Sequence, residues 1–129
     1  MTSSAPARIL VVDDNVDAAE TLTTFLDMIG LEARSVHDGN AAVQAALSFA
    51  PDLVLLDIGL PGMSGYDVAR AMRLQPQLAG VTLVALTGWG AEDDRRRAKD
   101  AGFDHHLTKP VDLSVLEDML KGVQTVQRP

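Results

Sequence analysis

Short, almost wholly apolar runs alternate along this chain with segments whose apolar residues recur at helical spacing. Three runs cover residues 9–12, 53–56 and 81–86, and only Thr82 interrupts the third. Runs of this kind are typical of strands that helices cover on both faces, so they predict a parallel sheet. Two less apolar segments, residues 31–36 and 105–109, are expected to be its edge strands.

Helical spacing of apolar residues predicts five helices, placed within residues 16–29, after Asp38, after Ser64, within residues 91–101 and over about 113–123. Gly30 and Gly102 supply stops for the first and the fourth helix. Asp38 is a candidate cap for the second, and Ser64 with Asp67 forms a capping-box pattern for the third. Five alternations of strand and helix predict a doubly wound α/β domain with a five-stranded parallel sheet.

The composition of the chain restricts its possible functions. Its 129 residues, of which 47% are apolar, fit one domain. We expect a disordered lead-in over residues 1–7, a folded domain over 8–124 and a frayed tail over 125–129. The absence of cysteine excludes disulfides and thiolate metal sites. The net charge of −7 disfavours direct binding to nucleic acid or an anionic membrane, and no apolar run reaches the roughly 18 residues of a membrane span. These features indicate a cytoplasmic protein.

Polar residues follow four of the five predicted strands at their carboxyl ends. The first strand ends in Asp13 and Asp14, the third in Asp57, the fourth in Thr87 and the fifth in Lys109. In open parallel sheets, ligands bind outside this edge. We therefore expect three carboxylates, one hydroxyl and one ammonium group to converge there.

Three carboxylates at one edge would repel one another strongly. Two carboxylates about 4 Å apart repel by roughly 4 kcal/mol at an effective dielectric constant of 20, a large share of the total stability of a domain. A bound cation would offset this repulsion, and all-oxygen ligands favour Mg²⁺, Ca²⁺ or Mn²⁺ over zinc. A metal, Lys109 and Thr87 around Asp57 match the needs of phosphoryl transfer, with Asp57 as the nucleophile.

With these motifs in this order and spacing, the chain resembles the receiver domain of bacterial two-component response regulators from Arg8 to about Val123. The matching motifs are Val11-Val12-Asp13-Asp14, Leu55-Leu56-Asp57, Leu60-Pro61-Gly62-Met63-Ser64-Gly65, Ala85-Leu86-Thr87 and Lys109-Pro110. The resemblance implies a flavodoxin-like (βα)5 fold with strand order 2-1-3-4-5.

The resemblance also implies how the acidic residues work. Asp57 is expected to take a phosphoryl group from a phosphohistidine of a histidine kinase, in a reaction that needs Mg²⁺ and that Mn²⁺ or Ca²⁺ can also support. Asp14, Asp57 and the backbone carbonyl of Gly59 are expected to bind the metal directly, and Asp13 mainly through water. The domain is then a signalling switch that catalyses only its own phosphorylation and dephosphorylation.

Further residues receive roles from the same resemblance. Thr87 and Lys109 are expected to contact the phosphoryl oxygens, and the peptide bond before Pro110 to be cis. Thr87 and the residue three before the lysine form the switch of the family, and here the second position is His106 rather than an aromatic residue. A histidine is smaller and more polar than tyrosine or phenylalanine, so its inward-buried state should be less favoured.

Two residues at the rim of the site are unusual for the family. We expect Trp89 to shield the acyl phosphate from water and Gly59 to leave access open. The expected partners are a histidine kinase or a histidine phosphotransfer protein, with a protein target on the face of the fourth helix, fifth strand and fifth helix, and with a phosphorylation-dependent dimer. Residues 104–110 look most like receivers of hybrid sensor kinases, whereas Met1 favours a free-standing regulator.

Other candidate residues are assigned to structure rather than function. Asp52 lies at the opposite end of the third strand from Asp57, so we expect it on the plain surface. His37 is expected to be exposed at a strand end. The chain also has methionines that are interpreted as core residues, namely Met28, Met72 and Met119.

The basic run at residues 95–97 is interpreted as a solvated helix face rather than a nucleic-acid site. Arg96 follows Glu92 and Arg97 follows Asp93 at a spacing of four residues, which favours ion pairs within the helix.

Three rival functions are less consistent with the residues. A phosphohydrolase of the haloacid dehalogenase type needs an acid two residues after its nucleophile, where this chain has Gly59. A flavodoxin-like module needs a phosphate loop after the first strand, where Asp13 and Asp14 would repel a phosphate. A degenerate receiver that only binds partners is disfavoured because all five site residues are present.

Overall fold

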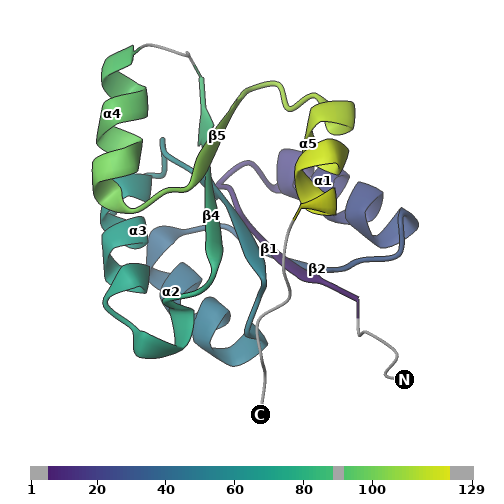
Figure 1. Ribbon diagram of the computed structural model, residues 1–129, viewed down its shortest axis with the longest axis horizontal. Coiled ribbons are helices and arrows are strands. Elements are labelled where there is room, and N and C mark those ends of the chain that lie inside the picture. Colours follow the sequence, from purple (N-terminus) through teal and green to yellow (C-terminus); the bar gives the residue numbers. More distant parts are fainter. Residues whose placement is uncertain (1–5, 89–91, 123–129) are drawn as a thin grey trace.

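The computed structural model describes residues 6–88 and 92–122 and contains a five-stranded parallel sheet in the order β2-β1-β3-β4-β5 (Figure 1). Its strands are β1 (Arg8–Val12), β2 (Glu32–Val36), β3 (Leu53–Asp57), β4 (Thr82–Thr87) and β5 (His105–Thr108). Its helices are α1 (Val16–Met28), α2 (Gly39–Phe49), α3 (Gly65–Arg73), α4 (Glu92–Ala101) and α5 (Leu113–Lys121), with a short 3-10 helix η1 (Pro76–Leu78). The predicted fold class and strand order are confirmed, and β2 and β5 are the edges.

Several expectations fall on parts of the chain that the structure leaves undescribed. The lead-in over residues 1–7 is described only at Pro6 and Ala7, and the tail over 125–129 is not described. The same holds for Trp89, and for the side chains of residues 92–95, on which the ion pairs to Arg96 and Arg97 depend. Among the described residues, no helix is both long enough and apolar enough to cross a membrane.

Helices cover both faces of the sheet, as the almost wholly apolar central strands predict (Figure 1). Helices α2, α3 and α4 lie on one side, and α1 and α5 lie on the other. Along β1, Leu10 and Val12 belong to the apolar core of the first side, whereas Ile9 and Val11 belong to the core of the second. Since side chains alternate between faces along a strand, a strand between two cores has to be apolar at every position.

Local sequence signals set the starts of two helices as expected. The Asp38 carboxylate caps α2 by accepting the backbone N–H of Ala41 at 2.7 Å, and the Ser64 hydroxyl caps α3 by accepting the N–H of Asp67 at 3.3 Å. The Asp67 carboxylate accepts from the Arg70 guanidinium at 3.1 Å. This pairing draws Asp67 towards the next turn of the helix.

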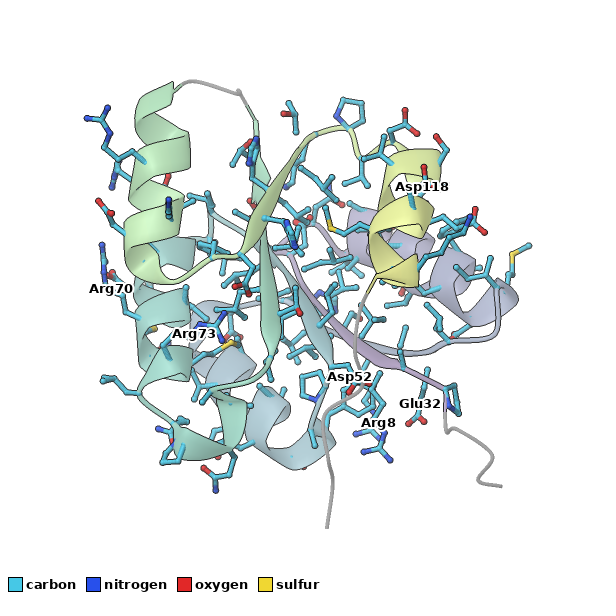
Figure 2. The ribbon with its side chains drawn as sticks, in the orientation of Figure 1. Arg8, Glu32, Asp52, Arg70, Arg73 and Asp118 are labelled. Atoms are coloured by element: carbon cyan, nitrogen blue, oxygen red, sulfur yellow. The ribbon has the colours of Figure 1, made fainter. Side chains whose placement is uncertain are left out.

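Asp52 contradicts the expectation of a plain surface residue. Its side chain is fully buried, and its carboxylate accepts the backbone N–H of Arg8 at 2.7 Å. Arg8 begins β1, and its N–H faces the residue just before β3. Figure 2 shows Asp52 beside Arg8 and Glu32 at this end of the sheet. The carboxylate is buried because it satisfies a strand-terminal donor that would otherwise be unpaired.

The methionines do not all fill the core. Met72 is buried, and Met119 is partly buried against the core under α1 and α5. Met28 is 80% exposed, so its assignment to the core was wrong. It follows the buried Leu26 by two residues, which places it on the opposite side of the last turn of α1.

Candidate functional site

The register of the sheet brings the ends of four strands together. Val12 is paired with Leu56, so the residues that follow them, Asp13 and Asp57, lie side by side at the end of β1 and β3. Thr87 is the last residue of β4, and its carbonyl oxygen accepts the backbone N–H of Lys109 at 2.7 Å. All the polar strand-end residues predicted to converge therefore lie at one edge of the sheet.

An acidic cluster forms the centre of this edge. Asp13, Asp14 and Asp57 each place a carboxylate oxygen within 4.8 Å of those of the other two. Asp13 and Asp57 are buried, whereas Asp14 is exposed. Backbone donors orient the two buried groups, because the Asn15 N–H reaches Asp13 Oδ1 at 3.0 Å and the Gly59 N–H reaches Asp57 Oδ1 at 2.9 Å. The cluster is thus fixed on its inner side and open to solvent on its outer side.

Lys109 bridges the two buried carboxylates. Its Nζ lies 3.2 Å from Asp13 Oδ2 and 3.0 Å from Asp57 Oδ2. Burial alone would lower the pKa of Lys109, but the hydrogen bond and charge of Asp57, aided by Asp13, outweigh it and raise that pKa. The ammonium group therefore stays protonated at neutral pH.

The charges of the cluster are not fully compensated. Burial raises the pKa of Asp13 above its ordinary value, and the nearby charge of Asp57 adds to the rise. The Asn15 N–H and the Lys109 ammonium act in the opposite direction but do not cancel it. One ammonium among three carboxylates leaves a surplus of negative charge, and hard oxygen donors of this kind suit Mg²⁺. The residues present therefore fit a divalent cation.

Thr87 contributes a buried hydroxyl group that has no hydrogen-bond partner among the described residues. A buried polar group left unpaired destabilises a protein by about 1–3 kcal/mol. Thr87 lines a pocket of about 440 Å³ together with Asp57, Gly59 and Lys109. The hydroxyl is thus positioned to bind a polar group that enters beside Asp57.

Other residues with expected roles lie nearby in different ways. The Lys109–Pro110 peptide bond is cis, as expected. His106 is half-buried on β5 and lines a groove along α4 with Lys99 and Phe103. This groove is separate from the pocket of Asp57, so the switch role of His106 stays a prediction. Trp89 lies outside the described residues.

His37 is closer to the site than the sequence indicated. It is half-buried rather than exposed, and its Nδ1 lies 3.1 Å from the carbonyl oxygen of Asp13. Val36, the last residue of β2, is paired with Val12, the last residue of β1. The residues that follow them, His37 and Asp13, therefore lie side by side. The register between strands, which the sequence does not give, decides this contact.

Two further residues of the pocket were missed by the sequence reasoning. Tyr66 on α3 is buried, and the guanidinium carbon of Arg97 on α4 lies 4.5 Å from the centre of its ring. Both residues line the same pocket as Asp57. They are 31 positions apart in the chain, and the only local signal, the basic run in α4, indicated pairing within the helix instead.

Comparison with known proteins places the chain in a family. The family model described as "Response regulator receiver domain" matches residues 9–121. The transcriptional regulator RpaA of Synechocystis is 32% identical over 121 residues, which cover 94% of this chain and 49% of RpaA. The DNA-binding response regulator MtrA of Mycobacterium tuberculosis is 42% identical over 103 residues, covering 80% of this chain and 44% of MtrA. The chain thus spans about half of each of these relatives.

Solved structures share the whole fold. The chemotaxis protein CheY4 of Vibrio cholerae superposes with a TM-score of 0.88 at 27% identity, covering 93% of this chain and 100% of CheY4. The receiver domain of the sensor histidine kinase PA1611 of Pseudomonas aeruginosa, with magnesium in its active-site cleft, gives a TM-score of 0.82 at 32% identity, covering 91% of this chain and 96% of that domain. The receiver domain of yeast Ssk1, crystallised with the phosphotransfer protein Ypd1, gives a TM-score of 0.83 at 28% identity, covering 93% of this chain and 90% of that chain.

The family match covers most of the chain, and the acids, threonine and lysine that carried the resemblance meet at one edge of the sheet. This chain belongs to the receiver domain family of two-component response regulators.

Proposed function

We propose that Asp57 is the phosphoacceptor of this domain and that its phosphorylation switches the conformation of the domain. One arrangement supports this proposal above all. The Asp57 carboxylate lies 3.0 Å from Lys109 Nζ and shares its pocket with the Thr87 hydroxyl, which has no partner among the described residues. A nucleophile, a fixed positive charge and a free donor around one space are what transfer of a phosphoryl group requires.

The transfer converts a phosphohistidine of the partner into an aspartyl phosphate. A carboxylate oxygen of Asp57 attacks phosphorus, and the new O–P bond forms as the P–N bond to the imidazole breaks. The electron pair of that P–N bond stays on the leaving nitrogen, which takes a proton. Lys109 and the Thr87 hydroxyl would then contact the phosphoryl oxygens, and no redox step is involved.

A divalent cation belongs to this proposal. Asp13, Asp14 and Asp57 would hold Mg²⁺ with the backbone carbonyl of Gly59, and Mn²⁺ or Ca²⁺ would substitute. The bound ion would offset the negative charge of the carboxylates and of the phosphoryl group. The acidic cluster supports the assignment, as does the magnesium in the cleft of the PA1611 receiver.

The partners follow from the same reaction. Receiver domains work with histidine kinases or phosphotransfer proteins, and the complex of the Ssk1 receiver with Ypd1 supports a donor of this class. The proposal also includes binding of a protein target at the face of α4, β5 and α5 and a dimer that forms on phosphorylation. It further includes self-catalysed dephosphorylation, a folded domain over residues 8–124 and a cytoplasmic location.

Replacement of the acceptor tests the central step. Asp57→Asn should abolish incorporation of label from acetyl phosphate in the presence of Mg²⁺, because an amide oxygen is a poor nucleophile. Asp118→Asn is a matched control, since it removes the same charge at an exposed position on α5. Chelation of Mg²⁺ should also abolish labelling of the parent. Equal labelling of the parent and the Asp57→Asn variant would show that Asp57 is not the acceptor.

A further inference from the structure

Arg97 and Tyr66 form a contact between two helices at the pocket of Asp57. Tyr66 lies in the first turn of α3, directly after the loop that follows β3, and Arg97 lies on α4, which follows β4. The guanidinium carbon of Arg97 is 4.5 Å from the ring centre of Tyr66. Tyr66 is 5% exposed, whereas Arg97 is exposed. The ring is therefore the buried partner of the pair, and Arg97 is the partner that solvent can reach.

The charge of the pocket explains why this contact matters. Lys109 and Arg97 both line it beside Asp57, so its positive groups are an ammonium and a guanidinium. The Lys109 ammonium is already within 3.2 Å of two carboxylates. A phosphoryl group on Asp57 would bring roughly 1.5–2 further negative charges to a cluster of three carboxylates that Lys109 and the proposed cation already have to compensate. Arg97 is the second cationic side chain at the wall of the pocket.

The cation–π contact with Tyr66 binds the guanidinium group of Arg97 only weakly. A cation over an aromatic ring at an exposed site is attracted far less than a guanidinium that donates two parallel hydrogen bonds to a phosphate. The planar fork of arginine matches phosphate oxygens better than the point charge of lysine. A phosphoryl group beside Asp57 would therefore compete successfully with the ring for Arg97.

We propose that Arg97 is a phosphoryl-recognition residue: its guanidinium lies on Tyr66 in the free domain and moves to the phosphoryl oxygens when Asp57 is phosphorylated. The inference rests on the proposed function of Asp57. It adds a residue from α4 to the site, beyond the acids, Thr87 and Lys109. Since Tyr66 belongs to α3 and Arg97 to α4, the move exchanges a contact between the two helices for a contact between α4 and the site.

Binding of a phosphoryl mimic tests the recognition step. With Mg²⁺ present, Arg97→Gln should weaken beryllofluoride binding about five- to tenfold, since one charge-assisted contact is lost. Arg96→Gln is the matched control, because Arg96 is the adjacent arginine on the same helix, is exposed and does not line the pocket. It removes the same charge and should change binding less than about twofold. Equal affinities of the Arg97→Gln and Arg96→Gln variants would overturn the proposal.

The chain offers a direct probe of the movement. Tyr66 is its only tyrosine, so 3-fluorotyrosine labelling gives one fluorine NMR signal, at the ring that Arg97 covers. Beryllofluoride with Mg²⁺ should shift this signal in the parent, and Arg97→Gln should remove most of that shift. If beryllofluoride shifts the signal of the variant as much as that of the parent, the shift does not come from a movement of Arg97. Arg97 would then stay on the ring in the parent, and its role would be only to pack α4 on α3.

Two controls keep the outcomes separate. If the parent itself fails to bind beryllofluoride, the proposed function of Asp57 is wrong, whereas a parent that binds with no difference for Arg97→Gln refutes only the role of Arg97. If Arg97→Gln lowers the melting temperature, Arg97→Lys gives the same comparison. It keeps the charge and most of the stem but loses the fork, so the affinity should fall between those of the parent and Arg97→Gln.

Discussion

The hydroxyl group of Thr87 is buried without a partner among the described residues, which is a destabilising arrangement for a side chain in the middle of the sheet edge. Thr87→Val keeps the shape and removes the hydroxyl. We expect the free energy of unfolding of the ion-free domain to stay equal or rise by up to about 1 kcal/mol, since an unsatisfied group disappears. Urea denaturation measures this change.

The same substitution should impair function. Without the hydroxyl, the Mg²⁺-dependent response to beryllofluoride should fall strongly, because Thr87 lines the pocket of Asp57. A loss of stability above about 1 kcal/mol would instead indicate that the hydroxyl has a structural partner in the folded domain. Stability and function are expected to change in opposite directions, as they do where a site is held in a strained or unsatisfied state.

Asp52 illustrates the opposite case, a buried polar group with a structural task. Asp52→Ala would leave the Arg8 N–H, now 2.7 Å from the carboxylate, without its acceptor. We expect the free energy of unfolding to fall by about 1–3 kcal/mol. Asp118→Ala, at an exposed pair with Lys121, should change it by less than about 0.5 kcal/mol. Equal effects of the two substitutions on denaturation would show that the bond to Arg8 contributes nothing.

At the scale of elements, the start of α3 packs directly on the end of β3. A Cβ atom at Gly65 would lie 2.5 Å from the carbonyl oxygen of Asp57 and 2.6 Å from Ile58 Cα. Both are backbone atoms that cannot move aside without shifting the acceptor. Gly65→Ala should therefore lower the free energy of unfolding by about 1–3 kcal/mol and reduce labelling of Asp57.

Gly59 provides the comparison for Gly65. Among the described residues, a Cβ atom there would meet only Asp57 Oδ1, at an ordinary contact distance of 3.7 Å. Gly59→Ala should thus keep its stability within about 0.5 kcal/mol of the parent, and thermal denaturation of both variants checks the contrast. If Gly65→Ala is as stable as Gly59→Ala, helix α3 is less tightly fixed to the site than its position indicates.

At the scale of the whole molecule, the surplus of negative charge at one sheet edge opposes folding until a cation binds. Mg²⁺ should raise the melting temperature of the parent, because an ion that binds only the folded state stabilises it by roughly 2.7 kcal/mol at 100 times its dissociation constant. Asp13→Asn should melt higher than the parent without Mg²⁺ and gain much less from Mg²⁺. A Mg²⁺-induced gain equal to that of the parent would exclude Asp13 from the cation site.

The pH dependence of the ion-free domain has a definite sign. Burial raises the pKa of Asp13 above its ordinary value of 3.8, so between these two values the folded state binds more protons than the unfolded state. The contribution of Asp13 to the free energy of unfolding therefore falls as the pH rises through that window. Asp13→Asn should abolish this part of the pH dependence in urea titrations.

Local patterns in the sequence were enough to predict the strands and the polar residues at their carboxyl ends. Strands buried on both faces are largely apolar, so β1 and β3 were visible as unbroken runs and β4 as a run interrupted only by Thr82, and the polar residues that end these runs had to lie at one edge. The caps at Asp38 and Ser64 were also local signals, because a cap and the N–H that it satisfies are only three residues apart.

Contacts between distant segments became visible only once the elements were packed together. The burial of Asp52 depends on the backbone N–H that Arg8 donates to it from the start of another strand, and the place of His37 depends on the register of β2 against β1. The contact of Arg97 with Tyr66 depends on how α4 packs beside α3. Periodicity along a chain tells which face of an element is buried, but it carries no information on what lies opposite, because that is fixed by packing between elements far apart in sequence.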